Sequence, residues 1–176
     1  MVKKNLCIFI SGNGSNLKAI IDRSRIYNFP AQVKIIVSNN RKAKGLAIAK
    51  KNLIPFFIFD SKSLCGEMKI INEIRRRKIH LICLAGYMKI LSKNFVKSFP
   101  NSIINIHPSL LPKFKGLKTY QKVLKNKEKK TGCTVHYVNE KLDCGKIIKR
   151  KYFFLEKKEN EKSLKNKTQK LEHKIY

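Results

Sequence analysis

The sequence predicts an α/β fold: an open, mostly parallel, twisted sheet with helices on both faces. Short apolar runs of strand length alternate with segments of helical spacing from the N-terminus onward, which is typical of βαβ units with right-handed crossovers. The chain has 176 residues, of which 43% are hydrophobic, enough for one domain with one core. No linker or internal repeat occurs before residue 150, so we expect residues 1–176 to form a single domain.

The first half of the chain alternates regularly between the two kinds of element. We expect the strands, each a short run rich in β-branched or aromatic residues, at residues 6–10, 33–38, 55–59 and 81–85. We expect helices between them at residues 17–21, 45–51 and 63–78. In the last of these helices, Met68, Ile71 and Ile74 are spaced to face the core.

A glycine-rich turn, Ser-Gly-Asn-Gly-Ser-Asn, follows the first strand at residues 11–16. Glycines let the backbone approach an anion closely, and the free N–H groups at the start of the next helix point toward it. The turn is neither Gly-x-Gly-x-x-Gly nor Gly-x-x-x-x-Gly-Lys-Ser/Thr, so dinucleotide and ATP sites are weakly indicated. By its residues alone it is equally an ordinary strand-to-helix turn.

Two polar residues, Asn105 and His107, lie at the end of the next apolar strand, which begins at Ser102. Pro108 cannot donate a backbone hydrogen bond, so the strand should end there. Residues two apart share a face of a strand, and ligands of open α/β sheets bind at this carboxyl edge. An amide beside an imidazole suits a reaction with an oxyanion and proton transfer. The alternative is a strand end with two solvated polar residues.

The second half predicts a helix at residues 120–126, strands at 133–138 and 146–154, and a final helix at 161–176. The final helix has an apolar stripe that includes Leu164 and Leu171. Asp143 lies in the loop between the two strands, where an aspartate is most often a turn residue. His136, within the first of these strands, is more often a packed strand residue than a catalyst.

The formal net charge is +29, from 40 Lys and Arg against 11 Asp and Glu. Such an excess is typical of nucleic-acid-binding proteins, but here the cations are spread along the whole chain and Asn and Ile are also abundant. We therefore favour compositional drift and expect no nucleic-acid partner, although anionic ligands should be attracted. No apolar run reaches the length of a membrane span, so no membrane association is expected.

The five cysteines are odd in number and form no Cys-x-x-Cys, which favours reduced, structural thiols in the cytoplasm. Neither cysteines nor histidines have the spacing of zinc ligands, so no metal is expected.

Residues 105–116 read Asn-Ile-His-Pro-Ser-Leu-Leu-Pro-Lys-Phe-Lys-Gly. This stretch resembles the signature of the folate-dependent formyltransferases, and the resemblance implies their Rossmann-like fold over one catalytic domain. It also implies a catalytic trio of Asn105, His107 and Asp143, the last from a Leu-Asp-x-Gly motif. Cys144 stands where family members usually have glycine, and it would cramp the loop if that position needed a positive φ.

Three further motifs match the family in the same order along the chain. The glycine-rich turn resembles its phosphate loop, residues 85–91 resemble its folate loop, and residues 168–176 resemble the helix that supplies a carboxylate to the substrate amine. For the folate loop, the alternative is that its apolar residues simply face the core. The implied substrate-binding residues are Gly14, Ser15, Asn16 and Glu172, and the implied folate-binding residues are Met88, Lys89, Ile90 and Leu91.

The resemblance implies an enzyme that transfers the formyl group of 10-formyltetrahydrofolate to the amine of glycinamide ribonucleotide, in cytoplasmic purine biosynthesis. Asn105 and protonated His107 would stabilise the oxyanion, and Asp143 would raise the pKa of His107. Formyltetrahydrofolate hydrolysis, formylation of methionyl-tRNA and a non-catalytic nucleic-acid-binding role remain alternatives. Family members continue beyond the final helix, so we expect a shortened C-terminus, for which a homodimer is one way to cover the helix.

Overall fold

The computed structural model describes residues 2–59 and 63–176, which form two compact units, Met1–Ile104 (unit 1) and Asn105–Tyr176 (unit 2). Unit 1 contains β1 (Lys4–Ile10), α1 (Ser15–Ser24), β2 (Ala31–Ser38), α2 (Gly45–Lys51), β3 (Phe56–Ile58), α3 (Leu64–Arg76), β4 (Leu81–Leu84) and α4 (Lys93–Ser98). Strand β5 (Ile103–His107) begins in unit 1 and ends in unit 2. Unit 2 continues with α5 (Thr119–Lys125), β6 (Lys130–Tyr137), β7 (Ile147–Phe154) and α6 (Glu161–Ile175).

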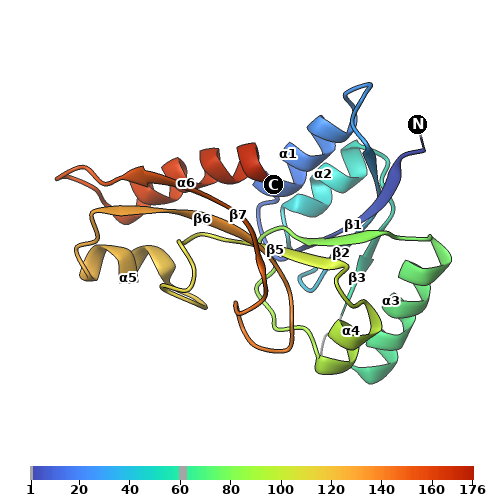
Figure 1. Cartoon of the computed structure of the whole chain (residues 1–176). Helices are drawn as coiled ribbons and strands as arrows, with labels where there is room; N and C mark the ends of the chain where they lie inside the picture. Colours follow the sequence, from blue (N-terminus) through green and yellow to red (C-terminus); the bar gives the residue numbers. More distant parts are fainter. Residues whose placement is uncertain (1, 60–62) are drawn as a thin grey trace. The chain divides into compact units, whose positions relative to one another are not determined.

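The sheet of unit 1 has the strand order β3-β2-β1-β4, and each pair of neighbours is parallel. Helices α1 and α2 lie on one face of these strands and α3 and α4 on the other (Figure 1). Ile8 at the centre of β1 pairs with Ile36 of β2 and Cys83 of β4. Such apolar neighbours on both sides are typical of a central parallel strand that is buried on both faces.

Three phenylalanines from separate segments form the aromatic core of unit 1. Phe9, Phe59 and Phe95 are each no more than 2% exposed. The ring of Phe9 lies 6.4 Å from that of Phe59 and 5.6 Å from that of Phe95, both edge-to-face. This geometry is favourable for aromatic rings, and it fixes β1 against α4 and the segment that follows β3.

Helix α4 is an element that the sequence did not lead us to predict. Ser92 caps its first turn by accepting a hydrogen bond from the N–H of Phe95 (2.9 Å), and the Ser92 hydroxyl donates to buried Glu67 of α3 (2.7 Å). The prediction that Met68 faces the core was wrong, because this side chain is 49% exposed and Ile70 is buried in its place. Ile71 and Ile74 are buried as expected.

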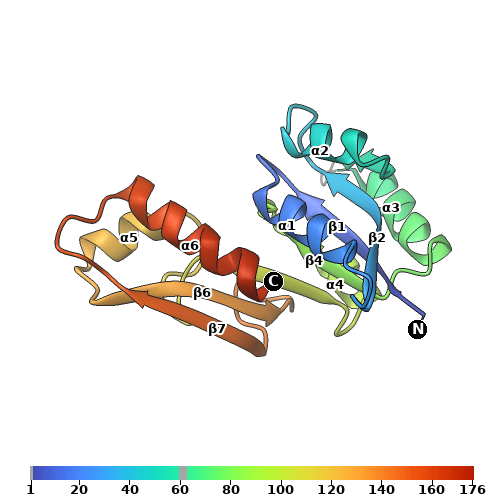
Figure 2. The same ribbon diagram turned by 90° about the horizontal axis from the view of Figure 1, so that it is seen from above.

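In unit 2 the strand order is β5-β6-β7, and β6 and β7 are antiparallel, with Gly132 opposite Tyr152. Helix α6 lies along this pair and contacts α5 (Figure 2). Leu164, Thr168 and Glu172 are its buried residues. The predicted fold class is confirmed: an α/β protein with a mostly parallel sheet. No helix among the described residues has both the length and the apolar character to cross a membrane.

Candidate active site

The carboxyl end of β5 positions the first two predicted catalytic residues. Ile103 and Ile106 are buried in the core, and Asn105 between them is partly accessible. His107 ends the strand and is only 5% exposed. The buried isoleucines therefore fix the strand in the core, while the amide and the imidazole belong to its last three residues.

The imidazole of His107 lies between two oxygen acceptors. Its Nε2 is 2.9 Å from the carbonyl oxygen of Phe114, and its Nδ1 is 3.3 Å from Oδ2 of Asp143. Burial lowers the pKa of His107 below its usual 6.5, although the charge of Asp143 and the Phe114 carbonyl each raise it. The effect of Asp143 therefore has the predicted direction, but the cost of burying the imidazolium outweighs the attraction of the carboxylate.

Asp143 is held in a left-handed turn with φ of 48°, a conformation that Asp and Asn adopt more readily than most residues. Its Oδ2 accepts a hydrogen bond from the N–H of Gly116 (2.8 Å). Burial raises the pKa of this carboxyl, but contacts with His136, the Gly116 amide and the charge of His107 together lower it to about 2. Asp143 is therefore ionised at neutral pH.

Cys144 stands where family members usually have glycine, and the loop accommodates it without strain. The positive φ belongs to Asp143 itself and not to Cys144, so the cysteine does not cramp the loop. Its sulfur instead accepts a hydrogen bond from the Lys115 ammonium (2.7 Å). Gly145 is the constrained position, since a Cβ there would lie 1.7 Å from the carbonyl oxygen of Tyr137.

His136 of β6 joins the predicted trio. It is 1% exposed, and its Nε2 lies 3.2 Å from Nδ2 of Asn105 and 3.6 Å from Oδ1 of Asp143. Its Nδ1 is 2.8 Å from the carbonyl oxygen of Tyr137, which can only accept, so Nδ1 carries a proton. In the neutral ring, Nε2 then accepts from the Asn105 amide. The sequence pattern around His136 did not indicate whether the ring contacts the catalytic residues or only packs within the strand.

The loop at residues 108–116 supplies backbone partners to the trio, and side chains from β6 and β7 hold it in place. The Thr134 hydroxyl donates to the carbonyl of Ser109 (2.7 Å) and accepts from the N–H of Leu111 (3.1 Å). Arg150 donates to the carbonyl of Leu111 (2.5 Å). The Phe114 carbonyl and the Gly116 amide thereby reach His107 and Asp143.

In unit 1, Ser11 connects three loops at the carboxyl ends of β1, β2 and β4. Its hydroxyl donates to Oδ1 of Asn39 (2.5 Å) and accepts from the N–H of Met88 (2.8 Å), and its carbonyl accepts from Nδ2 of Asn40 (3.1 Å). The glycine-rich turn and the predicted folate loop are thus neighbours at one edge of the parallel sheet of unit 1, where ligands bind in open α/β sheets.

Gly14 has a packing role beside its predicted contact with phosphate. It has φ of 77°, and a Cβ on it would lie 2.8 Å from the Cα of Gly45 in α2. The N–H of Gly45 also donates to the carbonyl of Gly12 (3.0 Å). The first turn of α1 carries no acidic residue, so nothing there repels an anion. Ser15 begins α1 and Asn16 is buried.

The remaining predicted binding residues differ in exposure. Met88 and Ile90 are 65% and 73% exposed, and Lys89 is exposed, whereas Leu91 is only 8% exposed and belongs to the core of unit 1. Glu172 is buried on α6 of unit 2. Burial of Cys133 and, to a lesser extent, the charge of Glu172 raise the pKa of the Cys133 thiol to about 12. Within residues 2–59 and 63–176, no cluster of three or more His, Cys, Asp or Glu side chains could hold a metal ion.

Comparisons with known proteins identify relatives over nearly the whole chain. The family model described as formyl transferase matches residues 4–176. The chain is 41% identical to phosphoribosylglycinamide formyltransferase of Haemophilus influenzae, over 82% of this chain and 70% of the relative. It is 37% identical to the Bacillus subtilis enzyme of the same name, over 98% and 91%. The crystal structure of phosphoribosylglycinamide formyltransferase from Anaplasma phagocytophilum matches with a TM-score of 0.93 and 38% identity, over 98% of this chain and 82% of that one.

Proposed function

The chain belongs to the formyl transferase family, and from this premise we propose that it transfers a formyl group from 10-formyltetrahydrofolate to the amine of glycinamide ribonucleotide. The relatives that carry the name phosphoribosylglycinamide formyltransferase support this acceptor. The reaction belongs to purine biosynthesis, and we assign it to the cytoplasm. The odd number of cysteines and the lack of a Cys-x-x-Cys motif support this compartment.

The observation that carries the proposal is the polar cluster of unit 2. Its four side chains form a chain of contacts. The amide of Asn105 lies 3.2 Å from His136, His136 lies 3.6 Å from Asp143, and Asp143 lies 3.3 Å from His107. The cluster offers an amide donor, an imidazole and an ionised carboxylate in one buried place. These are the groups that a formyl transfer through a tetrahedral oxyanion needs.

The proposed chemistry begins when the substrate amine attacks the formyl carbon and forms a C–N bond. The carbonyl oxygen becomes an oxyanion, and one N–H of Asn105 stabilises it while the other contacts His136. The bond from the formyl carbon to N10 of the folate then breaks, and the proton lost by the attacking amine is delivered to N10 through His107. Ionised Asp143 stabilises the imidazolium that forms on the way. Because Nε2 of His107 contacts the Phe114 carbonyl, donation to the oxyanion requires the ring to exchange this partner.

The binding residues complete the proposal. We assign the ribose phosphate to the helix start at Gly14, Ser15 and Asn16, and the folate to residues 88–91, with Leu91 acting as buried support. Glu172 is assigned to the substrate amine. The proximity of the two unit 1 loops through Ser11 supports their joint assignment, and the exposed apolar side chains of Met88 and Ile90 offer a contact surface for an aromatic ring system.

The decisive experiment is a formyl-transfer assay with purified protein, glycinamide ribonucleotide and 10-formyltetrahydrofolate, followed by detection of both products. His107→Ala should lower kcat by roughly 10²–10⁴-fold, the usual contribution of a general acid–base. His80→Gln is the matched control, because His80 is an exposed histidine of unit 1, and it should keep wild-type kcat.

Two results would overturn the proposal. Wild-type kcat in folded His107→Ala would remove the imidazole from the mechanism. Release of formate from the folate at the same rate with and without glycinamide ribonucleotide would instead identify a hydrolase.

A further inference from the structure

The face of β7 that points away from α6 carries exposed aromatic side chains. Tyr152 is 57% exposed and Phe154 is 68% exposed, and Ile148 on the same face is 48% exposed. Phe153, one residue along, points the other way, because the Lys167 ammonium of α6 lies 6.0 Å from its ring centroid. A folded protein usually buries aromatic rings of this size, so two exposed rings side by side indicate a contact surface.

One lysine, Lys130, lies beside these rings. The rings of Tyr152 and Phe154 meet edge-to-face with centroids 5.8 Å apart. Lys130 of β6 is the cross-strand partner of Phe154, and its ammonium lies 5.2 Å from the Tyr152 ring centroid. The arrangement therefore presents two exposed ring faces at an angle to each other, and a cation that can leave its ring for a stronger anionic partner.

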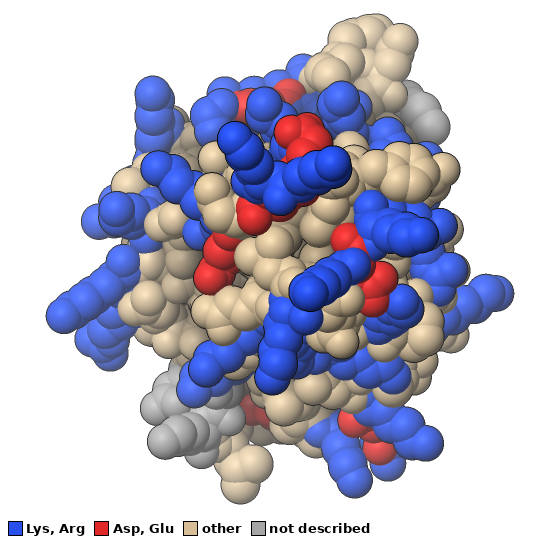
Figure 3. Space-filling model, turned by 90° about the vertical axis from the view of Figure 1, so that its left-hand side faces the viewer, with Lys and Arg blue, Asp and Glu red and all other residues tan. Residues whose placement is uncertain are grey.

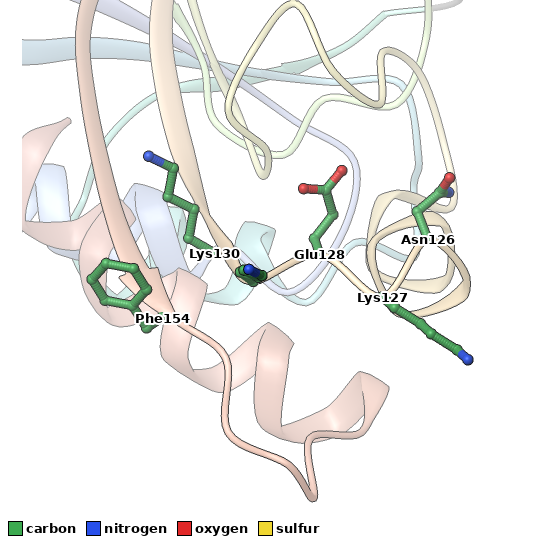
Figure 4. Close-up of a pocket in the computed structure, with 6 residues that line it drawn as sticks. Asn126, Lys127, Glu128, Lys130 and Phe154 are labelled. Atoms are coloured by element: carbon green, nitrogen blue, oxygen red, sulfur yellow. The ribbon is translucent and has the colours of Figure 1, made fainter.

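A hollow of about 450 Å³ adjoins Phe154 and is lined by Asn126, Lys127, Glu128, Lys129 and Lys130. Figure 4 shows Lys130 and Phe154 on neighbouring strands at its rim, while Lys127 points outward. Its one acidic side chain is already paired, because Lys113 contacts both carboxylate oxygens of Glu128 at 2.8 and 3.1 Å. The hollow is thus a cationic site next to an aromatic surface.

The surroundings carry the same charge. Figure 3 shows the side of the molecule on which α5, the start of β6 and the end of β7 lie. Lys and Arg side chains outnumber the acidic ones on this side. The overall excess of cations reflects the composition of the chain, but composition does not explain why two exposed rings sit among them.

We propose that this surface, the β7 platform, made up of Tyr152, Phe154, Lys127, Lys129 and Lys130, binds single-stranded nucleic acid. Bases would stack on the two rings and the lysines would contact the phosphates between them. Stacking on sheet aromatics with phosphate contacts from lysine is the general mode by which sheet surfaces bind unpaired strands. The site is separate from the residues proposed for formyl transfer.

A second copy of the chain fits this surface less well. An antiparallel pairing of two β7 strands would bring Lys149, Arg150 and Lys151 close to the same residues of the other copy. Like charges across a strand pair are destabilising, and the net charge of +29 adds long-range repulsion. An unpaired polyanion has the opposite charge and supplies the flat rings that Tyr152 and Phe154 can stack against.

The test is fluorescence anisotropy with a labelled octauridylate and the 176-residue chain. The Kd of the variant with both Tyr152→Ala and Phe154→Ala should rise at least roughly 10-fold, since each stacked base contributes about 5- to 150-fold. Tyr27→Ala removes a 91% exposed tyrosine of unit 1 and should leave the Kd unchanged. Lys130→Gln should reduce the slope of log Kd against log salt by roughly 0.7, and Lys51→Gln, at an exposed lysine of α2, should weaken binding less.

Equal Kd values for the wild type and the double aromatic variant, with both folded by circular dichroism, would overturn the proposal and leave only diffuse charge attraction. Competition by polyglutamate as effective as by unlabelled octauridylate would assign the surface to acidic peptides. Concentration-dependent dimerisation that the double aromatic variant abolishes, without octauridylate binding, would assign it to a second copy. Formyl transfer should be unchanged in these variants, so this result is independent of the proposed enzyme activity.

Discussion

The Nε2 atom of His136 lies 3.2 Å from the Nδ2 atom of Asn105, so a residue of β6 orients an amide at the end of β5. One N–H of the amide is used in this contact, and the other is left to meet an oxyanion. The direction of the donor is thus set before a substrate arrives, which is what preorganised electrostatic stabilisation requires.

Loss of His136 should therefore slow catalysis by releasing Asn105. We expect His136→Ala to lower kcat on the order of 10²-fold, the usual effect of a misplacement of about 1 Å, with little change in either KM. His136→Gln should recover part of the loss, because its side-chain oxygen can accept from the amide. Steady-state kinetics with both substrates measure this. Equal activity of the Ala and Gln variants would show that the ring fills space and does not orient Asn105.

Asp143 should stabilise the fold above acidic pH. Its folded pKa of about 2 lies below the ordinary value of 3.8, so its contribution is complete above pH 4 and is lost as the pH falls through 2. The shift corresponds to roughly 2 kcal/mol, and the side chain is only 7% exposed. Asp143→Asn should lower the free energy of unfolding at pH 7 and flatten its dependence between pH 5 and 2. Urea unfolding at several pH values tests this, and an unchanged slope in the variant would contradict it.

Gly145 should tolerate no side chain. Gly145→Ala would place a Cβ 1.7 Å from the Tyr137 carbonyl oxygen, so the loop that carries Asp143 must move, at a cost of about 1–3 kcal/mol. Gly12→Ala is the matched control, because a Cβ there meets no atom within 4 Å. Thermal unfolding should show a lower Tm for Gly145→Ala alone. Equal Tm values for the two variants would mean that the loop rearranges freely.

Two adjacent residues of the proposed phosphate site, Gly14 and Ser15, should respond differently to substitution. Gly14→Ala should lower the Tm, because Gly14 has a positive φ and its Cβ would lie 2.8 Å from the Cα of Gly45. Ser15→Ala should keep the Tm and raise the KM for glycinamide ribonucleotide more than the KM for the folate. If Ser15→Ala raises both KM values equally, the phosphate does not bind at this turn.

The strand positions were predictable because each strand is a distinct apolar run, whereas α4 was missed because it is short. Its six residues include only two buried side chains, Phe95 and Val96, too few for a helical period to be recognised. Ser92, three residues before Phe95, was the available indication of a helix start. Met68 was misplaced because the buried stripe of α3 begins at Glu67 and continues through Ile70, Ile71 and Ile74, and Met68 lies beside this stripe.

The trio of unit 2 was predicted from motifs, and so was the direction in which Asp143 shifts the pKa of His107, but the larger effect of burial was not. The sequence places Asp143 far from His107 along the chain, and only the fold shows that burial outweighs the charge of the carboxylate. His136 was underestimated because a histidine within an alternating strand has the same pattern whether it packs or orients a neighbour. The KM comparison for Ser15→Ala tests the phosphate role in unit 1, and the roles of residues 88–91 and of Glu172 stay predictions.

The supports of the loop at residues 108–116 have a consequence for the order of folding. Thr134 and Arg150 come from β6 and β7, yet they hold Ser109 and Leu111, which the ribosome releases earlier. A nascent chain can form the parallel strands of unit 1 as soon as they emerge, since domains fold progressively during synthesis. The partners of His107, however, have no fixed position until residue 150 has left the exit tunnel. The enzyme should therefore be inert through most of its own synthesis, and it should gain its active site as one of the last events of translation.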